Sequence, residues 1–207
     1  ELLTADHQNK ADLASSKARE WFDQQKIDML IGGTNSATNI AMAAVAADKK
    51  KPFISIGSAS SDMTNKACTP YTVHYAYDTV ALARGTGGAV VKDGGKTWFF
   101  LTADYAFGHA LERDTAAVVK SAGGEIKGQV RAPLSTGDFS SYMLQAQASG
   151  AKILGLANAG GDTINSIKQA AEGGIVAAEY QEHFGEHAYD NQGNYIGGAE
   201  STEAQEA

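Results

Sequence analysis

Short apolar runs alternate with Ala-rich, helix-forming stretches along most of this chain of 207 residues. Runs such as IDMLIG (27–32) and KILGLA (152–157) are apolar along nearly their whole length, as strands buried on both faces are. Consecutive strands that are separated by helices form right-handed βαβ units and parallel sheets. The sequence therefore predicts an α/β fold, in which parallel sheets are built from βαβ units.

The predicted elements fall into two sets. Strands are expected at residues 1–5, 27–32, 53–56, 71–75, 98–101, 125–132 and 152–157. Helices are expected at about 9–24, 37–49, 78–92, 108–122, 139–148 and in a last stretch that ends at Gly173-Gly174. About three βα units precede residue 75 and about three follow residue 95. We therefore expect a first α/β lobe over residues 1–75 and a second over residues 76–174.

The chain changes character after its last predicted helix, which carries Ile164, Ile167 and Ala171 on one face. No Lys or Arg follows Lys168, whereas eight acidic residues do. We therefore treat residues 175–207 as an acidic C-terminal segment to which the alternating pattern assigns no structure.

The composition argues against several classes of function. The net charge of −7 and the lack of a basic stripe make a nucleic-acid partner unexpected. No apolar run reaches the about 18 residues of a membrane span, and Glu1 opens directly on ELLTA, so neither a span nor a signal peptide is predicted. The single cysteine, Cys68, excludes an internal disulfide framework and an all-cysteine zinc site. We expect neither a cofactor nor a metal.

Four loops that follow predicted strands share one composition. They are GGTNS (32–36), GSASS (57–61), TADYAFG (102–108) and NAGGD (158–162). In open parallel sheets, ligands bind at the carboxyl ends of the strands. Backbone N–H groups and hydroxyls at those ends suit a small polar or anionic ligand such as a carboxylate. The same residues are common in ordinary βα turns, so composition alone leaves both interpretations open.

Motifs for catalysis are weak in this sequence. The string HFGEH places His183, Glu186 and His187 at the spacing of an inverted zinc-peptidase pattern, so a metal-dependent hydrolase is one alternative function. Gly185 weakens the helix that this pattern requires, and no second motif marks a third ligand. GSASS lacks the flanking glycines of a nucleophile elbow. We therefore assign no catalytic residue.

Three longer sequence segments resemble those of a known family. They are WFDQQKIDMLIGGTNSATNIAMAAVAADKKKPFISIGSAS, CTPYTVHYAYDT and FLTADYAFGHALERDT. From residue 1 to about Gly174, the chain resembles the periplasmic solute-binding proteins of branched-chain amino-acid-type ABC transporters, which have the type I periplasmic binding-protein fold. The resemblance implies two lobes that close over an amino acid or a related small carboxylate. It also implies a membrane permease as partner, a periplasmic location and no enzymatic activity.

The resemblance implies ligand contacts where this sequence matches the loops of the family. The implied ligand-binding residues are Ser36, Gly57, Ser58, Ala59, Tyr77, Tyr105, Phe107, Asn158 and Gly160. The Ser36 hydroxyl would meet the ligand carboxylate at a helix start, and the loop at 57–59 would grip the carboxylate and the α-amino group. Tyr77 lies where the chain crosses between lobes. Tyr105 and Phe107 would form an aromatic wall, and the loop at 158–162 would face the ligand from the second lobe.

Family members begin with another strand and helix before the stretch that matches ELLTADHQNK, and they continue far beyond the stretch that ends at Gly174. The resemblance therefore implies a partial or rearranged two-lobe fold, and we expect this chain alone to bind a family ligand weakly or not at all. A ligand-sensing module of the same fold is a further alternative. It requires an apolar dimer face on the first lobe, and the sequence shows no obvious one. Cys68 is then a free thiol or half of a disulfide.

Overall fold

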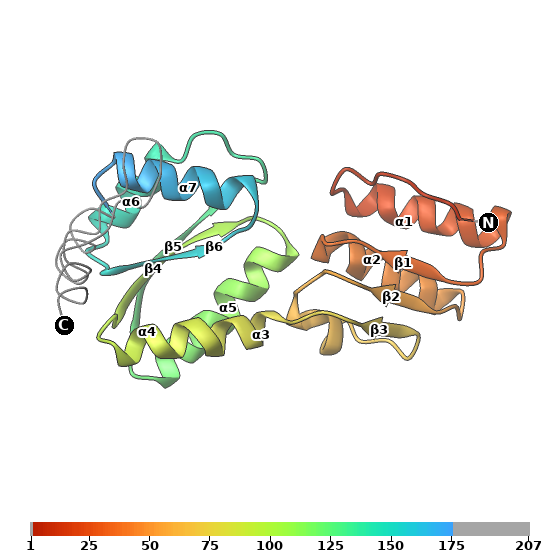
Figure 1. The fold of residues 1–207 in the computed structure, drawn as a ribbon, viewed down its shortest axis with the longest axis horizontal. Helices are drawn as coiled ribbons and strands as arrows, with labels where there is room; N and C mark the ends of the chain where they lie inside the picture. Colours follow the sequence, from red (N-terminus) through yellow and green to blue (C-terminus); the bar gives the residue numbers. More distant parts are fainter. Residues whose placement is uncertain (1, 176–207) are drawn as a thin grey trace, which may run out of the picture.

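The computed structural model describes residues 2–175, which form two parallel β-sheets joined by a helical crossing (Figure 1). The N-terminal sheet has the order β1-β2-β3, with strands β1 (Leu30–Gly32), β2 (Phe53–Ser55) and β3 (Thr72–His74). The C-terminal sheet has the order β5-β4-β6, with strands β4 (Thr97–Ala103), β5 (Glu125–Ala132) and β6 (Ile153–Ala157). Every described strand pair is parallel, which confirms the predicted α/β class.

Helices connect the strands in the order that the alternating pattern predicts. The helices of the N-terminal sheet are α1 (Ala11–Glu20), which continues into a π-helical turn at Trp21–Gln25, and α2 (Ser36–Asp48). The crossing consists of α3 (Thr79–Leu82), a π-helical turn at Ala83–Gly87 and α4 (Gly88–Lys92). The helices of the C-terminal sheet are α5 (Ala106–Ser121), α6 (Ser140–Ala148) and α7 (Gly161–Glu172). No helix in residues 2–175 has the length and apolar character that crossing a membrane requires.

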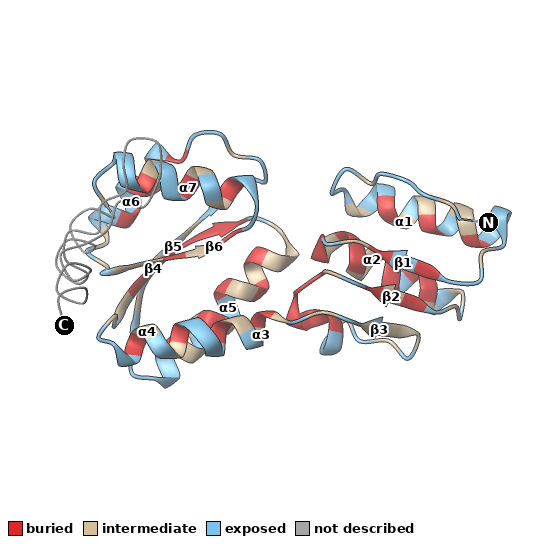
Figure 2. Cartoon of the chain, in the orientation of Figure 1, coloured by how far each residue is buried: buried red, intermediate tan, exposed pale blue. Residues whose placement is uncertain are grey.

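Both faces of the C-terminal sheet are covered by helices (Figure 1). On one face, Trp98 and Phe100 of β4 pack with Val119 of α5. On the other face, Leu101 packs with Met143 of α6. Every residue of β4 after the first is buried, and Figure 2 shows this strand in red between its neighbours. This sheet therefore has the two-sided core that parallel sheets ordinarily need.

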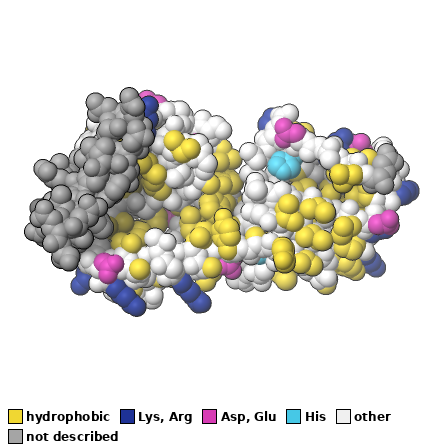
Figure 3. Space-filling view, in the orientation of Figure 1, with side chains coloured by type: hydrophobic (Ala, Val, Ile, Leu, Met, Phe, Trp, Pro, Cys, Tyr) yellow, Lys and Arg dark blue, Asp and Glu magenta, His cyan; other side chains and the backbone are white. Residues whose placement is uncertain are grey.

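The N-terminal sheet has one covered face and one exposed apolar face. On the covered face, Phe53 of β2 is buried in one cluster with Met42 of α2. On the opposite face, Ile31, Ile54 and Val73 form a row across the three paired strands. Within residues 2–175, Ile31 is 52% exposed and Val73 is 56% exposed. Figure 3 shows hydrophobic side chains gathered over this part of the molecule. The N-terminal sheet thus has an apolar face of the kind that a dimerising sensor requires, although the sequence showed no obvious one.

The predicted strand at residues 1–5 is wrong over its described part. Residues 2–5 form no regular structure and are largely exposed. A strand is stable only when a neighbouring strand takes up its backbone hydrogen bonds, and in the described N-terminal sheet β1 pairs with β2 alone. The other predicted strands are present: β5 has the predicted bounds, β4 is longer than predicted, and the remaining four are shorter.

Helix α7 lies where the sequence predicts it, but its apolar face points outward. Ile164 and Ile167 are 68% and 53% exposed, whereas Asp162 and Ser166 are buried. The Ser166 hydroxyl donates to the Asp162 carbonyl oxygen at 2.6 Å and accepts a hydrogen bond from the Asn158 side-chain amide at 3.1 Å. Because these polar groups satisfy one another, the helix can bury its polar face.

Two predictions about chain organisation have no test in the structure. The lobe boundary at residue 75 stays a prediction. Residues 176–207 lie outside the described residues, and with them nearly all of the acidic segment and the alternative metal ligands His183, Glu186 and His187.

Gly108, near the start of α5, leads to a test of this packing. A Cβ at this position would lie 2.0 Å from the Ala103 carbonyl oxygen and 3.0 Å from the Ala157 carbonyl oxygen. Both atoms belong to the backbone, so β4 or β6 would have to shift. We expect Gly108→Ala to lower the free energy of unfolding, measured by urea denaturation, by about 1–3 kcal/mol, as overpacking does.

Gly85→Ala is the matched control, because Gly85 is also helical and an added Cβ there meets nothing within 4 Å. Alanine favours a helix over glycine by about 0.5–1 kcal/mol, so this variant should be as stable as the parent or more stable. Equal free energies of unfolding for the two variants would contradict the described packing of α5.

Candidate functional site

The N-terminal half of the predicted site is built around the start of α2. Asn35 caps this helix, because its side-chain oxygen accepts a hydrogen bond from the Thr38 amide at 3.0 Å. Ser36 is the first residue of the helix and its exposed fraction is 0%. Its hydroxyl oxygen accepts a hydrogen bond from the Ser60 amide at 3.2 Å. Ser36 therefore fixes the loop that follows β2.

Two further side-chain contacts hold the loop after β2. The hydroxyls of Ser55 and Ser58 are hydrogen-bonded at 2.7 Å. The ring of His74, on β3, donates a hydrogen bond to the Ser58 carbonyl oxygen. Ser58 and Ala59 are buried, whereas Gly57 is partly exposed. The predicted ligand loop is thus tied to β2 and β3, and Gly57 is the most accessible of its three residues.

The C-terminal half combines an aromatic pair with a polar loop. Tyr105 precedes α5 and Phe107 lies in its first turn, and their ring centroids are 5.9 Å apart. Asn158 follows β6, and its side chain is hydrogen-bonded to residues of α7. Its amide donates to the Ser166 hydroxyl at 3.1 Å, and its oxygen accepts a hydrogen bond from a threonine of α7 at 2.8 Å. Gly160 is exposed with φ of +60°, a conformation that favours glycine.

Burial and a neighbouring carboxylate both favour the protonated form of Tyr105. Burial raises the pKa of Tyr105 to about 12, and the negative charge of Asp162 adds to the rise. Asp162 is buried and accepts a hydrogen bond from the Ser135 amide at 3.2 Å. The phenol can therefore donate a hydrogen bond to an anionic group at physiological pH. The pKa of Tyr105 is higher in the folded state than in the unfolded chain, so the protonated phenol stabilises the folded state. This contribution is fully present below pH about 10 and is lost as the pH rises towards 12.

The two halves lie at facing ends of the sheets. Figure 1 shows the start of α2 and the loop after β2 on the side of the N-terminal sheet that is turned towards α5 and α7, and α2 contacts α5. Tyr77 lies on the crossing segment and is 64% exposed. It precedes Asp78, which caps α3 by accepting a hydrogen bond from the Ala81 amide at 2.8 Å. That these residues contact a ligand stays a prediction.

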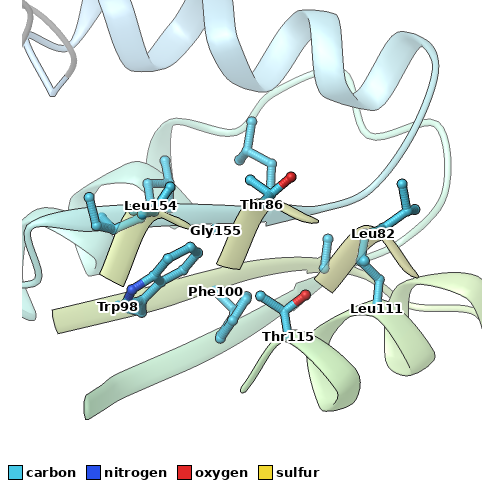
Figure 4. A pocket seen from close by; sticks show the side chains of 12 residues that line it. Leu82, Thr86, Trp98, Phe100, Leu111, Thr115, Leu154 and Gly155 are labelled. Carbon is cyan, nitrogen blue, oxygen red and sulfur yellow. The ribbon is translucent and has the colours of Figure 1, made fainter. Parts of the chain in front are cut away.

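A cavity of about 410 Å³ lies elsewhere, between the crossing helices, α5 and the face of β4 and β6 (Figure 4). None of the predicted ligand-binding residues lines it. Its walls are apolar, with side-chain hydroxyls from Thr86 and Thr115 and no charged side chain. A carboxylate would lose its hydration there without gaining charged or free backbone donors. We therefore place the candidate site at the strand ends and not in this cavity.

Residues 2–175 contain no group of three or more His, Cys, Asp or Glu side chains that could hold a metal ion. Cys68 is exposed and is a free thiol in the structure.

A polar cluster that no sequence pattern predicted lies between the two sheets. Asp114, on α5, accepts hydrogen bonds from the hydroxyls of Ser61 and Thr79, both at 2.6 Å. Arg113 donates to the Ser61 hydroxyl at 2.8 Å and lies 3.1 Å from a carboxylate oxygen of Asp62. In the sequence, the visible part of this cluster is the charged string ERD (112–114) in a predicted amphipathic helix. The hydroxyl partners of Asp114 precede it by 53 and 35 residues, so no local pattern identifies them.

Comparisons with known proteins point to one family. The family model described as periplasmic binding protein matches residues 1–202. The Leu/Ile/Val-binding protein homolog 6 of Brucella melitensis is 26% identical over 175 residues, which cover 83% of this chain and 44% of that protein. The chain thus spans about half the length of the curated relatives that it matches.

Solved structures agree with that match. A periplasmic binding protein from Burkholderia mallei is 67% identical with a TM-score of 0.83, over 86% of this chain and 47% of that chain. A branched chain amino acid ABC transporter periplasmic ligand-binding protein from Burkholderia xenovorans is 36% identical with a TM-score of 0.64, over 83% of this chain and 46% of that chain. The resemblance seen in the sequence is confirmed, and the chain belongs to the periplasmic binding protein family.

Proposed function

We propose that this protein is the solute-binding component of an ABC importer and holds an amino acid or a related small carboxylate between its two sheets. The observation that carries the proposal is the facing arrangement of the strand-end segments, with the start of α2 and the loop after β2 turned towards the start of α5 (Figure 1). Two relatives support it by name. One is a Leu/Ile/Val-binding protein homolog and the other a branched chain amino acid ABC transporter ligand-binding protein.

Each half of the proposed site supplies a different kind of contact. On the N-terminal side, backbone amides at the start of α2 and in the loop 57–59 attract a carboxylate, because helix starts carry unpaired N–H groups. On the C-terminal side, the Tyr105 phenol is a second donor and Phe107 offers apolar surface to the ligand side chain. Asn158 and Gly160 form the polar end of that side, and Tyr77 borders the site from the crossing segment.

The same proposal covers the cellular role. The protein would act in the periplasm without a catalytic step, and a membrane permease would recognise its ligand-bound form. Each sheet with its helices would be one lobe, with the boundary near residue 75, and closure of the lobes would exclude water from the ligand. The crossing through α3 and α4 would then act as part of the connection between lobes.

A ligand-sensing module is a second candidate, and one observation favours it. The row of Ile31, Ile54 and Val73 is the kind of apolar face through which a sensor would dimerise. Size-exclusion chromatography with light scattering separates the two candidates. A dimer that Val73→Lys dissociates would favour the sensor, and a monomer would favour the importer component.

Calorimetry with L-amino acids and with aliphatic and aromatic carboxylates tests the proposed ligand class. Because this chain spans about half the length of its relatives, we expect weak binding, with Kd of about 0.1 mM. Loss of one charge-assisted hydrogen bond, about 1.5–3 kcal/mol, moves a micromolar site into that range. The matched control is each ligand with its carboxylate converted to a primary amide. Equal affinity for acid and amide would contradict the proposed carboxylate end.

Ser36→Ala tests the N-terminal half of the site. The variant leaves the buried Ser60 amide without its acceptor, so we expect the free energy of unfolding to fall by about 1–3 kcal/mol and carboxylate affinity to fall with it. Ser121→Ala is the control, because it removes an exposed hydroxyl that donates to the Val118 carbonyl oxygen far from the loop after β2. Unchanged affinity in a folded Ser36→Ala variant would remove Ser36 from the site.

A further inference from the structure

The polar cluster around Asp114 joins elements of the two sheets. Ser61 and Asp62 belong to the 3-10 turn Ser61–Thr64, between β2 and β3 of the N-terminal sheet, and Thr79 opens the crossing helix α3. Asp114 lies in the middle of α5, which packs on the C-terminal sheet. One carboxylate therefore accepts hydrogen bonds from both the N-terminal side and the crossing.

The two carboxylates of the cluster are shielded from solvent, and the hydrogen bonds to Asp114 are short. The side chains of Asp114 and Asp62 are 11% and 9% exposed. The Arg113 guanidinium lies 2.9 Å from Asp114 and 3.1 Å from Asp62, so it balances two nearly buried negative charges. Burial alone would raise the pKa of Asp114, but the hydrogen bonds from the two hydroxyls and the guanidinium together lower it below its ordinary value. Charge-assisted bonds of this kind hold geometry more firmly than neutral ones do.

The same cluster is bonded to the proposed ligand loop. The Thr79 amide donates to the Ala59 carbonyl oxygen at 2.8 Å, and the Ser61 amide donates to the Thr79 hydroxyl at 3.0 Å. The neighbouring Ser60 amide donates to the Ser36 hydroxyl at 3.2 Å. A continuous chain of hydrogen bonds and backbone therefore runs from the predicted carboxylate end of the site to Asp114.

Helix α5 extends this connection to the other half of the site. The helix begins at Ala106, directly after Tyr105, and reaches Asp114 about two turns later. An α-helix of this length is rigid, so the position of Tyr105 follows that of Asp114. Both halves of the candidate site are thus tied to one carboxylate.

We propose that Asp114, with Arg113, Ser61 and Thr79, is a positioning cluster that sets the orientation of the two sheets and so aligns the two halves of the ligand site. The alignment of the site rests on the proposed function, whereas the orientation of the sheets does not. Asp114 acts through Ser61, Thr79 and α5 and has no proposed contact with ligand.

The distance between the sheets can be measured without a ligand. Cys68 is an exposed native thiol on the N-terminal side, and Lys168, on α7, has a side chain that is 72% exposed. Spin labels on Cys68 and on a cysteine introduced by Lys168→Cys report this distance by pulsed electron paramagnetic resonance. We expect a narrow distance distribution in the otherwise unchanged chain and a broader one in Asp114→Asn and in Thr79→Val.

Glu112→Gln is the matched control. Glu112 is a buried carboxylate on the same helix and accepts a hydrogen bond at 2.6 Å from the Thr102 hydroxyl, but Thr102 belongs to β4 of the same sheet. Loss of the hydrogen bond between Glu112 and Thr102 should lower the free energy of unfolding without broadening the distance distribution. Circular dichroism identifies variants that remain folded.

An unchanged distribution in folded Asp114→Asn and Thr79→Val, or equal broadening in Glu112→Gln, would overturn the proposal. A broadened distribution restricted to the cluster variants supports it even if no carboxylate binds, so failure of the proposed function would be seen separately, by calorimetry.

Discussion

The backbone of β4 is hydrogen-bonded to β5 on one side and to β6 on the other, and all three strands run in the same direction. Parallel strands cannot be joined by tight turns, so each returns through a helix and every carboxyl end emerges at one edge. This constraint brings Tyr105 and Asn158 to a common edge although they lie far apart in the chain. In the N-terminal sheet it brings Ser36 beside the loop after β2 in the same way.

Most polar side chains at these edges are bonded within the protein. The Asn39 side-chain nitrogen, on α2, donates to the carbonyl oxygens of Gly33 and Asn35, and Ser58 is hydrogen-bonded to Ser55. The buried side-chain oxygen of Asn39 has no hydrogen-bond partner among the described residues. Such internal bonds leave little freedom to the loops before any ligand arrives. A site made of these loops would therefore lose less conformational entropy on binding than a site made of mobile ones.

Strand and helix positions could be predicted from the sequence because their signals are local. Apolar runs such as residues 98–101 and helix stops such as Asp93-Gly94-Gly95 act over a few residues. The exposure of the Ile164 side chain on α7 could not be predicted, because the orientation of this helix depends on hydrogen bonds among side chains that the fold brings together. The same holds for Asp114, whose partners belong to other elements. For the candidate site, the sequence indicated the loops, whereas only the structure shows that Ser36 is wholly buried.

The unequal covering of the two sheets has a consequence for local unfolding. β4 is buried between helices on both faces, whereas Ile31 and Val73 leave the N-terminal sheet with an apolar face open to water. Free energies of local opening follow the amount of buried apolar contact around each hydrogen bond. Amide hydrogens of β1 to β3 should therefore exchange with solvent earlier than those of β4, and any polypeptide that covers Ile31 and Val73 would slow that exchange without touching the ligand loops.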